Sequence, residues 1–232
     1  MNLEIIATGA SGIAWTIVYL ALIYRGLKDK SYGMPLVPLA LNFAWEFVFS
    51  ILYPPENGGM AGRLINMVWM VFDIGIVFSY FRYSYAYFLA SYQLKRTHWL
   101  IVSLSAFFIS FGVMIFGGRL FGSFDRYFHR DIFQGAIFIA YVQNLIMSIC
   151  FLLMLWERRS VEGQSMTIAI FKCIGTSLSV GVYYLFSMHH GKASLMNLII
   201  LSTFIFDLVY IFSLYRQFSS EGIHPWTRKR SY

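Results

Sequence analysis

The chain is poor in charged residues. Only 12% of its 232 residues are Asp, Glu, Lys or Arg, whereas 58% are hydrophobic and 19% are aromatic. A soluble domain averages roughly 25% charged and 45–50% apolar residues, so this composition excludes a water-soluble globular protein. The sequence instead predicts an all-α, polytopic membrane protein in which residues 1–232 form a single domain.

Cysteine is also scarce. The sequence lacks the cysteine patterns of disulfide-rich and zinc-binding proteins, and it lacks the basic N-terminal region of a signal peptide. The two cysteines, Cys150 and Cys173, lie inside apolar runs, where a small core residue is expected rather than a disulfide framework. There is no CxxC pair and no Cys/His spacing typical of zinc, so no zinc site of this kind is expected. We also expect no cofactor. The N-terminus lacks the basic region of a signal peptide and carries Glu4 instead, which favours a first membrane span.

Seven apolar runs of about 20 residues predict a bundle of seven transmembrane helices. They lie near residues 4–24, 35–53, 63–81, 99–117, 132–156, 167–187 and 195–215. Twelve of the 18 Lys and Arg residues fall in the tail and in the loops after the first, third and fifth spans, against five on the opposite side. The positive-inside rule therefore predicts an N-terminus that is outside or lumenal and a C-terminus in the cytosol.

The same distribution accounts for the net charge of +7 without a nucleic-acid partner. We expect an integral, multi-pass protein whose surroundings are the lipid bilayer, in the endoplasmic reticulum if the source is fungal and in the cell membrane if it is bacterial. The segment 117–131 mixes aromatic residues with arginines. It is interpreted either as an interfacial aromatic belt with snorkelling arginines or as a lid over a substrate cavity.

Three acids are predicted to lie deep inside spans. At about 1.5 Å per helical residue, Glu46, Asp73 and Asp207 lie roughly 16, 15 and 18 Å into their helices, near the middle of a hydrocarbon core about 30 Å thick. A charged acid at that depth costs roughly 2.5–3.5 kcal/mol on insertion scales, and intramembrane ionisable groups commonly mark functional sites. The three acids are therefore candidate site residues.

Each acid has polar or aromatic neighbours at helical spacing, which we expect to line a substrate cavity. The candidate substrate-binding residues are Asn42 and Phe49 in the second span, Asn66, Trp69 and Asp73 in the third, Tyr141 in the fifth and Tyr210 in the seventh. The structural alternative is that these groups are hydrogen bonds between helices or ordinary packing. Lys172, in the sixth span, either pairs with an acid or snorkels to the interface.

An aromatic cavity with carboxyl groups suits acid-initiated carbocation chemistry. Burial disfavours the charged form of a carboxyl group, so one or more of the acids is expected to be neutral and able to protonate a substrate. Aromatic faces then stabilise a cation through their quadrupoles. A buried carboxylic acid is a weak donor that suits an epoxide oxygen, whereas an alkene would require a second group to strengthen the acid.

Three short motifs are similar to those of a known family. They are Tyr32-Gly33-Met34-Pro35, Asn42-Phe43-Ala44-Trp45-Glu46 and Ser11-Gly12-Ile13-Ala14-Trp15-Thr16. The chain resembles the small integral-membrane terpene cyclases of fungal meroterpenoid and indole-diterpene pathways, which also have bacterial relatives. The resemblance implies that Glu46 and Asp207 are the essential acids and that no metal is required. The DxDD and DDxxD motifs of soluble terpene cyclases are absent, as the resemblance would predict.

The resemblance also implies an isomerase- or lyase-type reaction on a hydrophobic prenylated substrate, in which protonation of a terminal epoxide or alkene starts polyene cyclisation. Glu46 would donate the proton or hold the donor, and Asp207 would assist it or take the final proton. The resemblance favours Asp207, rather than Asp73, as the partner of Glu46.

A proton-coupled transporter is the alternative function, because midplane acids suit proton relay equally well. The sequence has neither a Pro-Gln motif nor paired broken helices in two matching halves, which weighs against it. A retinal-type photoreceptor is excluded because the last span has no lysine.

Overall fold

A computed structural model describes residues 3–54, 59–124, 130–187 and 194–229, and within these ranges the chain is helical without strands. Among the described residues, six helical segments are long and apolar enough to cross a membrane. They are α1 (Leu3–Lys28), α3 (Gly59–Tyr92), α4 (Arg96–Gly122), α6 (Ile132–Arg158), the run α7–η2–α8 and α9 (Ser194–Ser220). All coincide with predicted spans, so the prediction of an all-helical membrane bundle is confirmed.

The second predicted span is shorter than the others. It consists of α2 (Leu36–Phe47, 12 residues), which begins after Pro35, and the π-helix η1 (Val48–Leu52, 5 residues). Together they extend at most about 26 Å, somewhat less than the roughly 30 Å of a hydrocarbon core. The sixth span also changes its winding, from α7 (Met166–Cys173) to the π-helix η2 (Ile174–Gly181) and then to α8 (Val182–Ser187).

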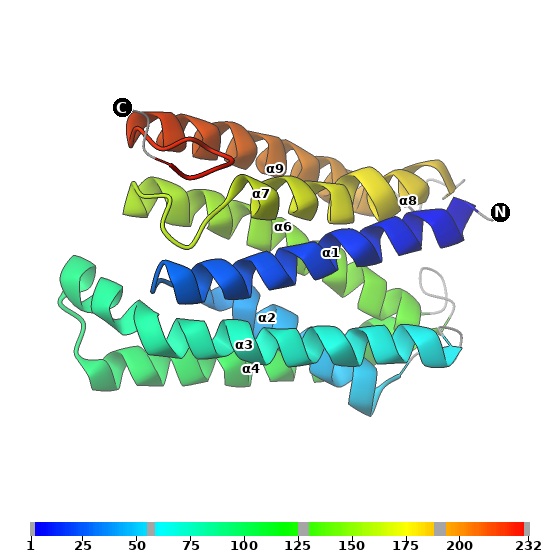
Figure 1. Cartoon of the computed structure of the whole chain (residues 1–232). Helices are drawn as coiled ribbons and strands as arrows, with labels where there is room; N and C mark the ends of the chain where they lie inside the picture. Colours follow the sequence, from blue (N-terminus) through cyan, green and yellow to red (C-terminus); the bar gives the residue numbers. More distant parts are fainter. Residues whose placement is uncertain (1–2, 55–58, 125–129, 188–193, 230–232) are drawn as a thin grey trace.

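The helices form a closed ring. α1 lies beside α3, α3 beside α2, α2 beside α6, α6 beside α9, α9 beside α7, and α7 with η2 returns to α1. α4 lies outside the ring against α2 and α6. In Figure 1, α1 runs between the α3/α4 pair below it and the α7/α9 pair above it. Side chains that point into the ring can thus meet from helices that are not direct neighbours.

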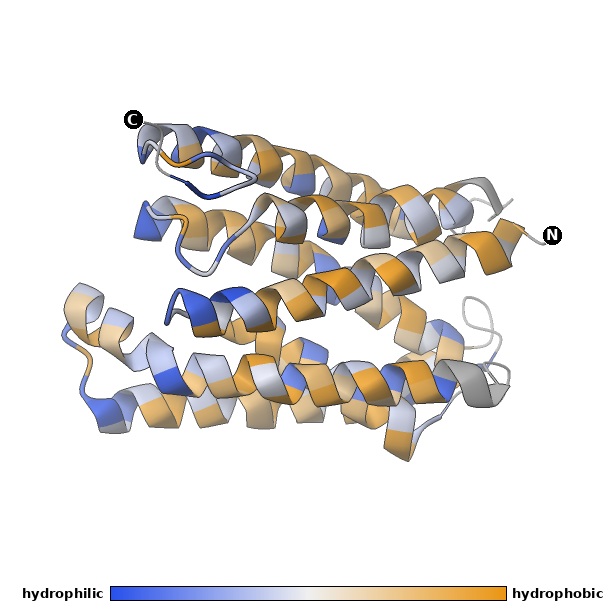
Figure 2. Ribbon diagram, in the orientation of Figure 1, coloured by the Kyte–Doolittle hydropathy of each residue, from blue (hydrophilic) through white to orange (hydrophobic). Residues whose placement is uncertain are grey.

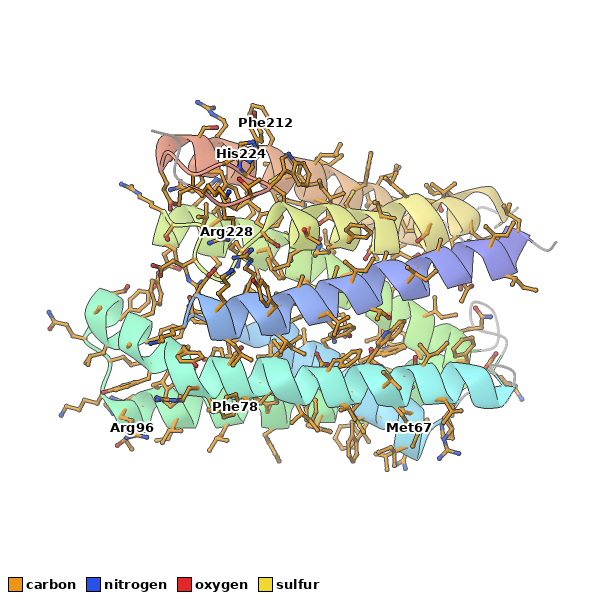
Figure 3. All side chains as sticks on the ribbon, in the orientation of Figure 1. Met67, Phe78, Arg96, Phe212, His224 and Arg228 are labelled. Carbon is orange, nitrogen blue, oxygen red and sulfur yellow. The ribbon has the colours of Figure 1, made fainter. Side chains whose placement is uncertain are left out.

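The outer surface of the ring is apolar over most of its length, and hydrophilic residues gather toward its ends (Figure 2). Phe78 of α3 and Phe212 of α9 project outward (Figure 3) and are 56% and 62% exposed, as lipid-facing side chains would be. The two termini lie at opposite ends of the bundle (Figure 1). Which of these ends faces the cytosol stays a prediction.

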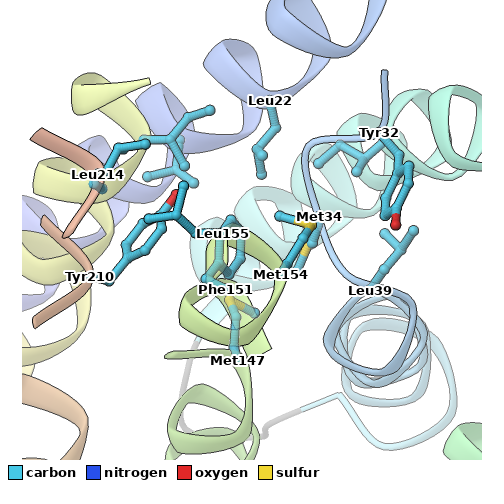
Figure 4. Packing of buried hydrophobic residues seen from close by; sticks show 14 of the residues in the cluster. Leu22, Tyr32, Met34, Leu39, Met147, Phe151, Met154, Leu155, Tyr210 and Leu214 are labelled. Atoms are coloured by element: carbon cyan, nitrogen blue, oxygen red, sulfur yellow. The ribbon is translucent and has the colours of Figure 1, made fainter. Parts of the chain in front are cut away.

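The interior of the ring at the end that carries the C-terminus is filled by a continuous apolar core (Figure 4). It includes Leu22 of α1, Met147 and Phe151 of α6 and Leu214 of α9. This core joins α1, α6 and α9 across the ring, and Tyr19 of α1 is one of its members. Of the segment 117–131, residues 125–129 lie outside the described residues, and the prediction of a lid or belt there stays open.

The Tyr32-Gly33-Met34-Pro35 motif closes this end of the bundle. A Cβ atom added at Gly33 would lie 2.7 Å from the carbonyl oxygen of Gly163, whose own φ is +72°, so both positions require glycine. The side chain of Gln164 donates to the carbonyl of Gly33 at 2.9 Å. The guanidinium of Arg158 lies 3.6 Å from the centre of the Tyr32 ring. The motif therefore has a structural role, binding the loop before α2 to the loop before α7.

The C-terminal tail folds back onto the same end (Figure 3). Arg228 forms a salt bridge of 3.0 Å with Asp29 and donates to the carbonyls of Val161, at 3.3 Å, and Gln164. Burial lowers the pKa of the Arg228 guanidinium from its ordinary value, and the charge of Asp29 opposes that shift. The tail thus fastens α1, the loop before α7 and α9 to one another.

Candidate active site

Five polar side chains from four ring helices meet in the interior, and we refer to them as the amide–acid cluster. They are Tyr19 of α1, Asn42 and Glu46 of α2, Asp73 of α3 and Gln143 of α6, all at most 5% exposed. Asn42 and Glu46 are four residues apart, so a regular helix places them on one face. That face points into the ring, while Trp45 points toward α6 and donates to the carbonyl of Ala136 at 3.0 Å.

The hydrogen bonds of this cluster begin at Gln143 and branch at Asn42, with one branch ending at Glu46 and the other at Asp73. Gln143 Nε2 donates to Asn42 Oδ1 at 3.1 Å. Asn42 Nδ2 donates to Tyr19 Oη at 2.6 Å and also to Asp73 Oδ2 at 2.8 Å. Tyr19 Oη in turn donates to Glu46 Oε1 at 3.1 Å. Because consecutive hydrogen bonds polarise one another in a low-dielectric interior, the chain presents a strengthened donor to one oxygen of Glu46.

Each acid of the cluster keeps one oxygen free. Glu46 Oε2 and Asp73 Oδ1 are buried and have no hydrogen-bond partner within the described part of the chain. A buried polar atom without a partner costs about 1–3 kcal/mol and therefore requires an explanation. A carboxyl oxygen that carries a proton, or that receives a ligand, would provide one.

Aromatic rings cover the cluster on the α1 and α3 side. Trp69 stacks against Tyr19 with ring centres 6.0 Å apart, and its indole nitrogen donates to Thr16 at 3.0 Å. Trp15 and Phe72 also pack on Tyr19, at 6.1 and 6.3 Å. Trp69, predicted from its spacing to Asp73, thus lies one ring away from the hydroxyl that contacts Glu46.

A second buried group, the lysine–aspartate cluster, consists of Ser148 of α6, Lys172 of α7 and Asp207 of α9. All three residues are fully buried. Lys172 Nζ forms a salt bridge with Asp207 Oδ1 and donates to Ser148 Oγ at 2.5 Å. Asp207 Oδ2 is buried without a partner among the described residues. Of the two alternatives for Lys172, the structure therefore has the paired charge and not the snorkelling side chain.

The two clusters lie on different sides of α6. Gln143 and Ser148 are five residues apart, which is about 7.5 Å along the helix and about 140° around it. Met147, which lies between them in the sequence, belongs to the apolar core. No hydrogen bond described in the structure connects Glu46 with Asp207, whereas Tyr19 and Asn42 connect Glu46 with Asp73. The structure thus groups Glu46 with Asp73, where we expected Asp207.

The family model of Pyr4-like transmembrane terpene cyclases matches residues 2–220. The chain belongs to this family. A terpene cyclase, pyr4 from Aspergillus fumigatus, is 41% identical over 75 residues, which cover 32% of this chain and 30% of that protein. The Pyr4-family terpene cyclase mfmH from Annulohypoxylon moriforme is 29% identical over 172 residues, covering 72% of this chain and 64% of that protein.

The terpene cyclase ascF from Acremonium egyptiacum aligns over 221 residues at 27% identity and covers 90% of this chain and 80% of that protein. The chain spans less than two thirds of the length of pyr4 and mfmH in these alignments. No solved structure matches the chain.

None of the other predicted lining residues of this Pyr4-like chain forms a hydrogen bond described in the structure with Glu46, Asp73 or Asp207. Phe49 packs against Gly118 of α4, outside the ring, and Asn66 is only half-buried. Tyr141 forms an edge-to-face contact with Tyr184 at 5.8 Å. Tyr210 donates to Gln164 at the closed end. A cavity of about 330 Å³ opens near that end between Tyr24, Arg25, Thr167 and Trp226, among others, and none of the predicted site residues lines it.

Two members of the amide–acid cluster were missed in the sequence. Gln143 lies eleven residues into the fifth predicted span, at the depth of the three acids, and that depth was a usable signal. Tyr19 has no such signal, because one tyrosine among 16 in an aromatic-rich chain is indistinguishable from packing. Within the described ranges, no three His, Cys, Asp or Glu side chains meet in a group that could hold a metal ion.

Proposed function

We propose that this Pyr4-like protein cyclises the prenyl chain of a meroterpenoid or indole terpenoid, with Glu46 as the general acid that starts the reaction. The substrate is a farnesyl-type chain, with or without a terminal epoxide, that enters from the bilayer. The observation that carries the proposal is the one-directional hydrogen-bond chain from Gln143 through Asn42 and Tyr19 to Glu46 Oε1.

The two oxygens of Glu46 have different surroundings, which supports a different role for each. Oε1 accepts the hydrogen bond from Tyr19, which stabilises the carboxylate that remains after proton transfer. Oε2 has no hydrogen-bond partner among the described residues and is the oxygen from which we propose the proton leaves. A hydrogen bond to the charged form favours that form, so Tyr19 supplies the strengthening group that a buried carboxylic acid requires for alkene protonation.

The reaction balances without a co-reactant. The proton of Glu46 Oε2 passes to the epoxide oxygen, the C–O bond breaks and a tertiary carbocation forms, or the proton adds to the terminal alkene. Successive alkenes of the chain then attack the cation and form the rings, while Trp69 and neighbouring aromatic rings stabilise the positive charge. Loss of a proton from carbon ends the sequence, so the product is an isomer of the substrate.

The test uses membranes that contain the full chain and a farnesylated aromatic substrate, supplied with and without the terminal epoxide. Glu46→Gln keeps the shape and removes the acid, and we expect it to lower the cyclisation rate by about 10²–10⁴-fold, the usual contribution of general acid catalysis. The exposed Glu157 at the end of α6 provides the matched control, since Glu157→Gln should retain the wild-type rate.

Full activity of Glu46→Gln would contradict the assignment of the donor. If the wild-type protein converts neither substrate and instead acidifies vesicles in a solute-dependent manner, proton-coupled transport replaces cyclisation. Family membership favours the cyclase.

A further inference from the structure

The lysine–aspartate cluster has no part in the proton donation just described, yet it contains two ionisable side chains in the middle of the bundle. We propose that Lys172 is a positioning residue, which holds Asp207 as an oriented carboxylate so that Asp207 Oδ2 accepts the proton that ends cyclisation. This inference rests on the proposed function and separates the roles of Glu46 and Asp207, donor and acceptor.

Asp207 has the surroundings that a buried carboxylate requires. A carboxyl group buried without a cation is stable only in its neutral form, whereas a buried carboxylate requires a paired cation and further hydrogen bonds. Asp207 has such a cation, because Lys172 Nζ forms a salt bridge with its Oδ1. Glu46 accepts a hydrogen bond from a tyrosine, and no cation pairs with it in the part of the chain that the structure describes. The two acids are therefore equipped for opposite protonation states.

The contacts of Lys172 also orient the carboxylate of Asp207. The hydroxyl of Ser148 donates to the carbonyl of Asn144 at 2.9 Å, so its oxygen is left to accept a hydrogen bond from Lys172 at 2.5 Å. Lys172 Nζ is thus held between Ser148 of α6 and Asp207 of α9. Because the ammonium occupies Oδ1, the carboxylate of Asp207 is fixed with Oδ2 free and buried.

The helix that carries Lys172 changes its winding close to this residue. The π-helix η2 begins two residues after Lys172, as η1 begins two residues after Glu46. π-helical turns occur frequently at functional sites. Glu46 and Lys172 thus both lie immediately before a change in helical winding. This feature of the backbone is an observation separate from the contacts of their side chains.

The chemistry follows from these contacts. The last carbocation of the cyclisation transfers a proton from a neighbouring carbon to Asp207 Oδ2, and the electron pair of that C–H bond becomes the new C=C bond. Asp207 is then a neutral acid, still paired through Oδ1. Transfer of that proton to water and reprotonation of Glu46 from water restore the starting state, so one proton enters and one leaves in each turnover.

The experiment measures product ratios in membranes that carry the full chain, using the epoxidised farnesyl aromatic substrate. In Asp207→Asn and Lys172→Met, cyclisation still starts at Glu46 but ends without an oriented base. We expect the ratio of the main cyclic alkene to alkene isomers and water-trapped alcohols to fall about 10²-fold, the scale of a lost general base. Lys172→Arg keeps a cation beside Oδ1 and should restore most of the wild-type ratio.

Folding is controlled separately. Lys172→Met/Asp207→Asn contains neither charge and should accumulate like the wild type, with the product mixture of Asp207→Asn. If Lys172→Met alone fails to accumulate, Ser148→Ala decides, because it removes one contact of Lys172 and keeps both charges. It should lower the product ratio several-fold, whereas Ser103→Ala, at another fully buried serine, which pairs with Tyr80, should not.

A wild-type product ratio in Lys172→Met overturns the inference about Lys172. If Lys172→Met does not accumulate, a wild-type product ratio in Ser148→Ala overturns it. In either case, cyclisation that still depends on Glu46 leaves the proposed function intact. A wild-type chain that converts no prenylated substrate overturns the proposed function itself, and the role of Lys172 with it.

Discussion

The amide–acid cluster and the lysine–aspartate cluster are buried to the same degree in one ring of helices, but their acids have opposite partners. Glu46 and Asp73 are surrounded by a phenol and two amides, whereas Asp207 is paired with an ammonium group. Burial alone therefore does not assign a role to an acid. The partner does, since a neutral hydrogen-bonding environment suits a proton donor and a cation suits a proton acceptor.

The clusters should also differ in how they contribute to stability. Removing one member of a buried ion pair leaves an uncompensated charge and typically costs about 3–5 kcal/mol. A neutral network loses only the partner of one polar group, about 1–3 kcal/mol. Three variants test this difference.

The largest effect is expected for Lys172→Met. It leaves the Asp207 carboxylate unpaired and should lower the free energy of unfolding by about 3–5 kcal/mol, seen as a lower melting temperature in detergent. Adding Asp207→Asn should recover most of the loss, because the remaining charge is removed. Equal melting temperatures for the single variant and the wild type would show that Lys172 and Asp207 do not form a charged pair.

An intermediate effect is expected for Gln143→Leu. The substitution removes the donor to Asn42 Oδ1 and leaves that oxygen buried and unpaired, at a cost of about 1–3 kcal/mol. Gln134→Leu, on the same helix but half-buried, is the control and should change the melting temperature less. If the two variants have the same melting temperature, the hydrogen bond between Gln143 and Asn42 contributes nothing to stability.

The smallest effect on stability is expected for Tyr19→Phe, which removes one hydroxyl and should cost about 1 kcal/mol. Its effect on rate is expected to depend on the substrate. Cyclisation of the alkene-terminated chain should fall more than that of the epoxide, because the alkene requires the stronger acid. Both cyclisation rates are measured in the same membranes, and the ratio of the alkene rate to the epoxide rate is compared with that of the wild type. An unchanged ratio would show that Tyr19 does not strengthen the acid.

Much of the fold could be predicted from sequence because membrane spans are read from one quantity, the length of apolar runs. Each predicted span coincides with a helix or a continuous helical run. The order of the helices around the ring could not be predicted, since hydropathy does not record which helix packs beside which. That order decides that Lys172 meets Asp207 across the interior.

The candidate site was predictable to the same extent. Counting residues placed Glu46, Asp73 and Asp207 at a common depth, and all three are buried. Their grouping required the rotation of each helix about its axis. Phe49 shows the limit, because its spacing from Glu46 suggested one face, yet η1 intervenes and Phe49 packs toward α4.

The π-helices have a consequence for how such chains can change in length. A π turn closes its hydrogen bond over one residue more than an α turn, so deleting a single residue from 48–52 or 174–181 could restore ordinary winding. The part of the span beyond the deletion would then rotate by about 100° relative to Glu46 or Lys172. We therefore expect relatives to differ by single-residue gaps at these two segments, each of which would redirect half a helix without altering its ionisable group.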